Sequence, residues 1–232
     1  MRLFYDSNIN SKSHKHQLSE SESKHIIRVL RMKKGNELGV LDGKGNLFYC
    51  EIIEESSKSC VLKINETLKS IQTTNEIHIA ISPPKKMDRI EWFIEKSTEI
   101  GITEFSFIQC KNSERISLKT NRLEKKAISA MKQSNQRFLP RINSMMTLEE
   151  FITKNPKGLI ANCHDLNKEK FSDVFELKKC PILIGPEGGF SLEEIKFANN
   201  NGYKNITLGK NRLRTETAGI YSCIQAKILM ND

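Results

Sequence analysis

The chain has 232 residues, of which 38% are hydrophobic and 28% are charged, a composition typical of a folded globular protein. This length permits either one large domain or two modest domains with separate cores. No apolar run approaches the roughly 18 residues that a membrane-spanning helix requires. Residues 1–6 (MRLFYD) also lack the apolar centre of a signal peptide. We therefore expect a cytoplasmic protein with no membrane partner.

Six cysteines are scattered along the chain and never form the C-x-x-C spacing that is typical of zinc or redox sites: Cys50, Cys60, Cys110, Cys163, Cys180 and Cys223. In a reducing compartment, such cysteines usually act as small buried hydrophobic residues. We therefore expect free thiols and no bound metal.

The formal net charge of +9 is concentrated in two segments. Lys12–Lys34 contains seven lysines and arginines against two glutamates, and Lys111–Arg141 contains nine against two. Because these local excesses of +5 and +7 together exceed the total charge, the rest of the chain is slightly acidic. Local positive charge of this kind suits a polyanion bound at one or two faces. A pair of solvated helix faces would give the same pattern.

Residues 37–65 predict a small β domain. Glu37–Leu41 and Leu47–Ile53 have the character of strands, and the intervening Asp42-Gly43-Lys44-Gly45 is typical of a hairpin whose glycines take positive φ. Val61–Ile64 predicts a further strand. Residues 66–75 are polar and lack a helical period, so we place a domain boundary there. The predicted domains are 1–70, a β domain, and 76–232.

From Ile77 onward, strand-like apolar runs alternate with amphipathic helices, which is typical of an α/β fold with a mainly parallel sheet. The predicted strands lie at 77–81, 105–108, 159–162, 181–184 and 206–208. One helix is predicted around 90–97, with Gly101 as its stop. The last helix begins near Thr215 and has apolar positions on more than one side, so it is a candidate for a subunit interface: Ile220, Tyr221, Ile224 and Ile228 on one stripe, then Cys223, Ala226 and Leu229.

The segment Ile182–Ile195 contains the strongest candidate site. A buried strand ends in Gly185-Pro186-Glu187-Gly188-Gly189, and Ser191 with Glu194 forms a capping box that begins a helix. Glycines let a backbone approach a ligand, and open α/β sheets bind ligands at the carboxyl ends of their strands. A side chain at Gly188 or Gly189 is expected to intrude on the ligand or to require unfavourable backbone angles. A purely structural turn is the alternative.

A second strand-to-helix junction, Leu208–Ala218, also contains a glycine, Gly209. The two junctions would form one pocket if their strands lay side by side. Within this junction Arg212 and Arg214 could bind a phosphate or orient a substrate base. A solvated loop, or salt bridges to nearby glutamates, is the alternative.

These two motifs, at this separation, resemble the 16S rRNA uridine-N3 methyltransferases of the SPOUT superfamily. Nearly the whole chain agrees with that family. Residues 25–31 (HIIRVLR), with Gly35 and residues 42–45, resemble its N-terminal PUA-like RNA-binding domain. Residues 96–101 (KSTEIG) resemble its first SPOUT helix, and Gln133-Ser134 with Arg137 and Pro140 resembles its central motif. The family commonly has Glu before Gln-Ser, where Lys132 stands here.

The resemblance implies a C-terminal SPOUT-type parallel sheet with a trefoil knot and a small N-terminal β-barrel. It implies S-adenosylmethionine as the methyl donor and a homodimer that methylates uridine N3 in 16S rRNA, within the small ribosomal subunit. The implied cofactor contacts are Leu183, Gly185, Pro186, Gly188, Leu208, Gly209, Leu213 and Thr215. The implied RNA contacts are Arg2, Arg28, Arg31, Arg137 and Arg212.

Methylation of N3 also requires removal of a weakly acidic proton. A nearby cation would favour the anionic base, and a carboxylate could accept the proton. Arg214 and Glu216 are the candidates for these two catalytic roles.

Two other functions stay open. The basic segments alone would suit a noncatalytic RNA-binding or ribosome-assembly protein, although the Gly-Pro-Glu-Gly-Gly loop argues against it. A SPOUT enzyme acting on another RNA, such as tRNA or a ribose 2′-hydroxyl, is disfavoured by the N-terminal resemblance. Adenosylmethionine binding distinguishes the first alternative, and nucleoside analysis distinguishes the second.

Overall fold

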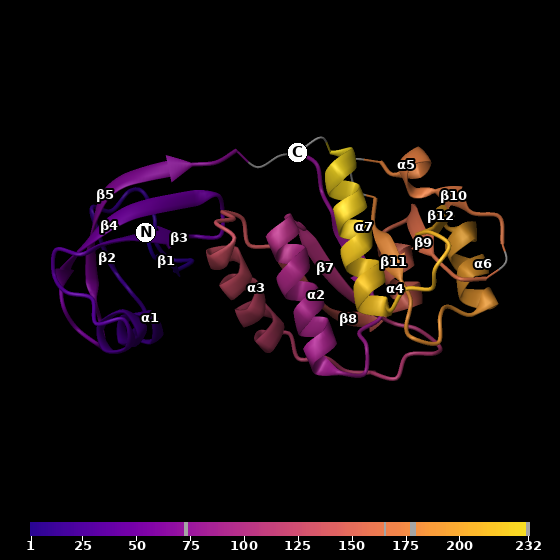
Figure 1. Ribbon diagram of the computed structural model, residues 1–232, viewed down its shortest axis with the longest axis horizontal. Coiled ribbons are helices and arrows are strands. Elements are labelled where there is room, and N and C mark those ends of the chain that lie inside the picture. The colour runs from indigo at the N-terminus through magenta and orange to yellow at the C-terminus, as the bar shows by residue number, and fades with distance from the viewer. Residues whose placement is uncertain (72–73, 165, 177–179, 231–232) are drawn as a thin grey trace. The chain divides into compact units, whose positions relative to one another are not determined.

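The computed structural model describes residues 1–71, 74–164, 166–176 and 180–230 (Figure 1). The chain divides into two compact units. The first contains Met1–Gln72 together with Met131–Leu139, and the second contains Thr73–Ala130 together with Pro140–Asp232. The late segment belongs with the N-terminal strands because Met131 is buried with Leu41 and Leu47. Phe138 also forms a β-bridge with Lys44.

The first unit contains a five-stranded sheet in the order β1-β3-β4-β5-β2. Its strands are β1 (Leu3–Tyr5), β2 (Lys15–Gln17), β3 (Glu37–Leu41), β4 (Asn46–Glu54) and β5 (Val61–Lys69). β1 runs parallel to β3, and the other pairs are antiparallel. The helical turns α1 (Glu20–Lys24) and η1 (His25–Val29) lie between β2 and β3 in the chain. The predicted hairpin is confirmed, since Gly43 and Gly45 have φ of 71° and 102°.

The strand prediction at Val61–Ile64 ends too early. β5 continues to Lys69 because Asn46–Tyr49 of β4 pairs with Glu66–Lys69 in antiparallel register. These polar residues carry no strand pattern of their own, so the neighbouring strand decides their conformation. Residues 72 and 73, within the predicted boundary, lie outside the described residues.

The second unit contains a seven-stranded sheet in the order β10-β12-β9-β11-β6-β7-β8. Every pairing in it is parallel, which confirms the predicted sheet type. Its strands are β6 (His78–Ile81), β7 (Glu104–Gln109), β8 (Arg141–Thr147), β9 (Gly158–Ala161), β10 (Glu169–Lys170), β11 (Ile182–Ile184) and β12 (Tyr203–Thr207). The edge strands β8 and β10 were not predicted, because an edge strand needs no continuous apolar run.

Helices cover both faces of this sheet (Figure 1). They are α2 (Met87–Ile100), α4 (Leu148–Lys154), α5 (Phe171–Val174), α6 (Leu192–Asn200) and α7 (Thr215–Leu229), whereas α3 (Asn121–Gln133) begins in the second unit and ends in the Met131–Leu139 segment of the first. One core cluster joins Leu183 of the sheet to Phe151 of α4 and Ile195 of α6. On the α2 side, Phe93 packs edge-on against Phe105. α2 ends at Gly101, with φ of 103°, and α7 begins at Thr215, as predicted.

The helix α7 has an unusual distribution of side-chain sizes. Its small residues Gly219, Cys223 and Ala226 are buried. A Cβ atom at Gly219 would lie 2.5 Å from the Phe93 ring, so α7 approaches α2 very closely. The large residues Tyr221, Ile224 and Ile228 remain 41%, 38% and 66% exposed. The helix therefore presents its bulkiest apolar side chains to the outside of this chain.

The described residues bear on two expectations from composition, the absence of a membrane-spanning helix and the state of the cysteines. No described helix combines the length and apolar character needed to cross a bilayer. All six cysteines are free, and five of them are buried, Cys163 being the exposed one. Burial raises the pKa of Cys50 and of Cys223 to about 12, so these thiols stay protonated at neutral pH.

Candidate functional site

A cavity of about 840 Å³ lies at the carboxyl ends of β9, β11 and β12. Three segments contribute to its lining: residues 161–164 and 168 from the end of β9 onward, 184–190 from the end of β11, and 206–215 with Ala218 from the end of β12, with residue 165 outside the description. Its volume is that of an ordinary small-molecule pocket. Its position is the one at which open parallel sheets bind ligands.

The strands that carry the two predicted glycine junctions are not neighbours. β9 lies between β11 and β12, so the side-by-side arrangement that was named as the condition for one pocket is not present. The junctions still meet in one cavity because Ala161, the last residue of β9, is level with Ile184 and Ile206 in register, and the loop after β9 joins the lining. That loop contributes Asn162, Cys163 and His164, none of which was predicted as a site residue. The signal that could have indicated this loop is the polar segment that follows the predicted strand at 159–162.

Two glycines of the cavity wall have conformations that other residues rarely adopt. Gly189 has φ of 74°, and its N–H donates to the Pro186 carbonyl at 2.9 Å. Gly209 has φ of 117°. A Cβ atom on either would meet no atom within 4 Å, so backbone angle rather than crowding requires glycine here.

The backbone strain predicted as one reason for glycine does not apply at Gly188, where a neighbouring side chain limits the space. Gly188 has no positive φ, and a Cβ atom there would lie 3.1 Å from Cβ of Asn112. Asn112 follows β7 and was not a predicted site residue. The missing side chain at Gly188 therefore makes room for a neighbouring protein side chain.

Hydrogen bonds from other loops hold the glycine loop at residues 185–190. Thr215 Oγ1 donates to the Gly185 carbonyl at 3.1 Å, and His164 Nε2 donates to the Phe190 carbonyl at 2.8 Å. Asn112 Nδ2 donates to the Gly189 carbonyl at 3.0 Å and to the Gly188 carbonyl at 3.4 Å. The loop then enters α6 through the predicted capping box of Ser191 and Glu194. It is thus supported at both ends and on its outer side.

Most of the predicted cofactor residues border this cavity. Those in the lining are Gly185, Pro186, Gly188, Leu208, Gly209, Leu213 and Thr215. Leu183 is the exception among them, because its side chain is fully buried in the sheet core. Its backbone is committed to pairing with β6 and β9.

The two predicted catalytic residues are placed differently. Arg214 is exposed and belongs to the cavity lining. Glu216 is 6% exposed and lies outside the lining. Its Oε1 is 3.6 Å from Nε of Arg89 on α2, and its buried Oε2 has no hydrogen-bond partner. The structure therefore does not bring Glu216 together with Arg214 at the cavity of this chain.

Positive charge dominates the rim of the cavity. Among the described residues of the lining, Lys168, Lys210, Arg212 and Arg214 are basic and Glu187 is acidic. The Glu187 carboxylate accepts a hydrogen bond from the Lys85 backbone N–H at 3.3 Å. Among the described residues, no three His, Cys, Asp or Glu side chains gather as metal ligands. The cavity thus suits an organic ligand with anionic or polar groups.

The remaining predicted RNA contacts lie in the first unit. Arg2, Arg28 and Arg31 are exposed. Arg28 donates to Ser57 Oγ at 3.2 Å. Arg137 is half-buried and donates to Ser70 Oγ at 2.9 Å, which leaves it less available to a ligand.

The two basic segments differ in how far their charge is neutralised. In Lys111–Arg141, five of the nine cations pair with carboxylates: Lys111, Arg122, Lys126, Lys132 and Arg141. In Lys12–Lys34, two of the seven do so, Lys24 with Glu20 and Lys33 with Glu55. The N-terminal segment therefore presents more uncompensated positive charge.

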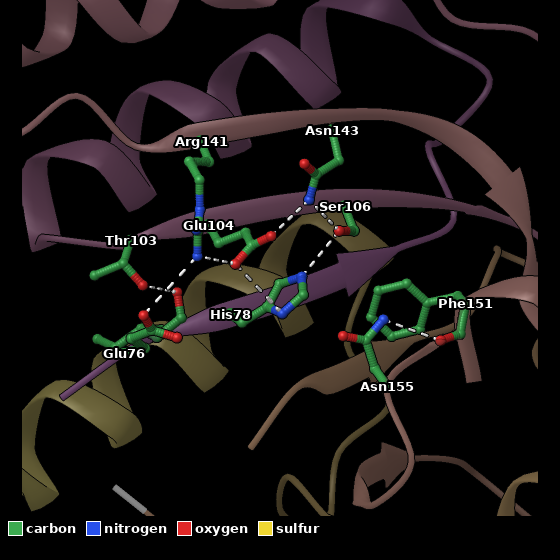
Figure 2. A network of polar contacts seen from close by, with 10 residues as sticks. Glu76, His78, Thr103, Glu104, Ser106, Arg141, Asn143, Phe151 and Asn155 are labelled. Atoms are coloured by element: carbon green, nitrogen blue, oxygen red, sulfur yellow. Dashed lines mark hydrogen bonds and ion pairs between the residues drawn. The ribbon is translucent and has the colours of Figure 1, made fainter. Parts of the chain in front are cut away.

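A second polar cluster lies at the amino ends of β6, β7 and β8 (Figure 2). Their first residues, His78, Glu104 and Arg141, are partners in register. His78 Nε2 is 2.8 Å from Ser106 Oγ, and His78 Nδ1 is 3.8 Å from a Glu104 oxygen. The order Ser-His-Glu resembles a hydrolase triad, but Ser106 is 1% exposed and the cluster borders no part of the cavity. We therefore interpret it as a structural network.

A parallel sheet that carries a glycine-lined cavity at its carboxyl edge, beside a separate β unit, defines a two-part α/β ligand-binding protein of the kind common among enzymes. Residues 72–227 match the family described as the RNA methyltransferase domain, and residues 18–65 match the RNA methyltransferase PUA domain. The chain therefore belongs to the RNA methyltransferase family.

Individual relatives agree with this assignment. The chain is 31% identical to a ribosomal RNA small subunit methyltransferase E from Aquifex aeolicus, with 92% of this chain and 93% of that protein covered. A probable rRNA-methyltransferase from Porphyromonas gingivalis is 37% identical, and its crystal structure superposes with a TM-score of 0.91 over 100% of this chain and 99% of that one.

The fold is also shared with a ribosomal RNA small subunit methyltransferase E from Neisseria gonorrhoeae, crystallised with bound S-adenosyl methionine. That chain is 23% identical, with a TM-score of 0.86, and the superposition covers 99% of this chain and 98% of that one.

Proposed function

We propose that this protein transfers a methyl group from S-adenosylmethionine to N3 of a uridine in small-subunit ribosomal RNA. The observation that carries the proposal is the cavity at the carboxyl edge of the parallel sheet, built from two glycine junctions in a chain of the RNA methyltransferase family. A noncatalytic RNA-binding protein has no need of such a cavity.

The residues of the cavity fit this cofactor. Ile184, Leu208, Leu213 and Ala218 supply apolar surface for an adenine ring. Backbone groups around Gly185, Gly188 and Gly209 are close enough for a ribose or amino-acid moiety, since these residues have no side chains. Lys168 and Lys210 of the rim suit the carboxylate of the methionine part.

When bound, the cofactor supplies an activated methyl group on a sulfonium sulfur. The protein must hold the uracil N3 in line with that methyl group and favour loss of the N3 proton. Arg214 is the proposed catalytic cation, because it lines the cavity and its guanidinium charge stabilises the anionic base. Glu216, whose carboxylate faces Arg89, is the weaker candidate for a proton acceptor.

The first unit is proposed to bind 16S rRNA within the small ribosomal subunit. The support for this proposal is the PUA-domain match and the uncompensated cations of Lys12–Lys34. Arg2, Arg28, Arg31 and Arg137 of this unit, with Arg212 of the cavity rim, are the proposed RNA contacts. A target base in a stack must be flipped out before N3 can meet the methyl group.

Two copies of the chain form the proposed functional unit, and the cavity loops form a trefoil knot, as the family resemblance implies. The large exposed apolar residues of α7 support a contact with a second copy: Tyr221, Ile224 and Ile228.

Methylation of rRNA from a strain lacking this protein tests the proposal. Purified protein, labelled S-adenosylmethionine and either free 16S rRNA or small subunits should yield 3-methyluridine in a nucleoside digest. Arg214→Gln should lower the rate constant at saturating substrates while leaving cofactor affinity nearly unchanged. A methylated ribose or a different base would contradict the N3 assignment, and absent adenosylmethionine binding would favour the noncatalytic alternative.

A further inference from the structure

We propose that Asn112 and His164 are positioning residues that preorganise the glycine loop 185–190 for the cofactor. The inference rests on the proposed function, since it assigns the cavity to S-adenosylmethionine. Neither residue lies in the two glycine motifs, and neither has to touch the reacting atoms.

Three consecutive backbone carbonyls of the loop accept hydrogen bonds from side chains of two other loops. Asn112 Nδ2 donates to the carbonyls of Gly188 and Gly189, and His164 Nε2 donates to the carbonyl of Phe190. The orientation of the peptide groups at residues 188–190 is therefore set from outside the loop. The loops after β7 and after β9 approach it from opposite sides. In the sheet, β9 lies on one side of β11, and β6 and then β7 lie on the other.

Asn112 can serve this purpose because its own segment is held rigidly. Ser113 Oγ accepts from the Cys110 N–H at 2.8 Å and is 2.8 Å from Ser82 Oγ. Arg115 Nε donates to the Pro84 carbonyl at 3.2 Å. The Lys111 N–H donates to Glu194 of α6 at 2.7 Å. The donor of Asn112 is thus presented from a fixed turn.

Gly188 is the complement of Asn112. A Cβ atom at Gly188 would lie 3.1 Å from the Asn112 Cβ and would push the amide away from the two carbonyls. The absence of a side chain at Gly188 consequently leaves the space that the Asn112 side chain occupies.

His164 acts from inside the cavity wall. It is half-buried, belongs to the lining, and comes from the loop after β9. Because the Phe190 carbonyl can only accept, Nε2 carries the proton of this hydrogen bond. His164 therefore couples the β9 loop to the residue that precedes the cap of α6.

The physical benefit is a smaller ordering cost on binding. A loop with two adjacent glycines samples many conformations, and fixing them at the moment of binding subtracts from affinity. Hydrogen bonds that order the loop in the absence of ligand remove part of this cost. Each neutral hydrogen bond contributes a net amount that corresponds to a change of about three- to tenfold in affinity.

Calorimetric titration of single variants tests the proposal. Asn112→Ala and His164→Ala should each raise the Kd for S-adenosylmethionine about three- to tenfold, and the Kd for S-adenosylhomocysteine by the same factor. The rate constant at saturating cofactor and the KM for RNA should hardly change, because the loop, once ordered by ligand, is the same. His164→Gln retains an amide donor and should recover part of the lost affinity.

Asn155→Ala is the matched control. Asn155 Nδ2 also donates to a backbone carbonyl, that of Phe151 at 3.0 Å, but it lies outside the cavity lining (Figure 2). This variant should keep wild-type cofactor affinity. It shows what loss of an asparagine–carbonyl hydrogen bond does when no cofactor loop is involved.

A double-mutant cycle distinguishes preorganisation from independent contacts. If both hydrogen bonds are needed together to order the loop, so that loss of either one already releases it, the double variant should lose less affinity than the product of the two single losses. Gly188→Ala should likewise add little to Asn112→Ala. Unchanged affinity in both folded single variants, or losses that multiply fully, would overturn the proposal. Failure of the wild-type protein to bind adenosylmethionine would instead contradict the proposed function.

Discussion

At the scale of single residues, burial decides the charge state of His78. Burial lowers its pKa, the Glu104 carboxylate partly opposes this, and Arg141 adds to the lowering. Below about pH 6.5 the unfolded chain therefore binds a proton that the folded chain refuses. The stability that His78 contributes is complete above that pH and is lost as the pH falls toward the lowered pKa.

We predict that this loss is measurable by urea denaturation at pH 7.5 and pH 5.5. The free energy of unfolding should decrease between these two pH values, and the decrease should be smaller in His78→Gln because this variant lacks the group whose pKa is lowered on folding. His14→Gln provides the matched control for a histidine-to-glutamine change, because His14 is exposed rather than buried. An identical pH dependence in wild type and His78→Gln would show that His78 accepts its proton without cost.

At the scale of elements, two helices begin with the same capping box but differ in what precedes them. In α6, Ser191 Oγ accepts from the Glu194 N–H at 3.2 Å, and in α4, Thr147 Oγ1 accepts from the Glu150 N–H at 3.1 Å. Only α6 follows the glycine loop of the cavity. A frayed start of α6 would free the end of that loop at Phe190.

We therefore predict a split between stability and affinity. Ser191→Ala and Thr147→Ala should each lower the free energy of unfolding by about 1 kcal/mol. Only Ser191→Ala should weaken adenosylmethionine binding, measured by calorimetry, because only its helix carries the cofactor loop. Equal cofactor affinity in the two variants would mean that the cap of α6 and the loop are independent.

At the scale of the whole molecule, charge neutralisation separates the two basic segments. We predict that RNA affinity decreases steeply with salt and that the N-terminal segment supplies most of this dependence. Replacing Arg28 and Arg31 by alanine should reduce the log–log slope by about 1.4 to 1.8, for two lost phosphate contacts. Arg122→Gln is the control, since Arg122 already pairs with Glu91.

Binding to 16S rRNA fragments, followed by filter retention from low to moderate salt, measures these slopes. If the slope changed more in Arg122→Gln than in the variant lacking Arg28 and Arg31, the RNA-binding surface would include α3 instead of the N-terminal segment. If the RNA affinity of the wild type did not change with salt, both basic segments would be solvated helix faces rather than RNA contacts.

The outer face of α7 supports a further prediction for the whole molecule. Tyr221→Asp together with Ile224→Asp should convert a dimer into monomers, because unpaired charge in an apolar interface is costly. Analytical ultracentrifugation measures the mass, and circular dichroism checks folding. Both residues are already exposed in the single chain, so a folded monomer is the expected product. A fully active wild-type monomer at assay concentration would rule out the two-chain unit.

Local sequence pattern determined much of this protein. The parallel α/β sheet, the hairpin at Asp42–Gly45, the stop at Gly101 and the box at Ser191 and Glu194 all follow from residue preferences that act over a few positions. The same holds for the two glycine junctions, whose residues Gly189 and Gly209 need φ values open to few other residues. Such features are readable because their cause lies in adjacent residues.

Tertiary structure alone decided the rest. β5 continues to Lys69 only because β4 pairs with it, and β9 separates the two junctions only because of the strand order. Glu216 turns toward Arg89, and Asn112 reaches Gly188 from 76 residues away in the chain. Contacts between residues so distant depend on how the strands assemble and on which side chains then have room. No local pattern encodes that information, so the support of the cofactor loop emerged only from the folded chain.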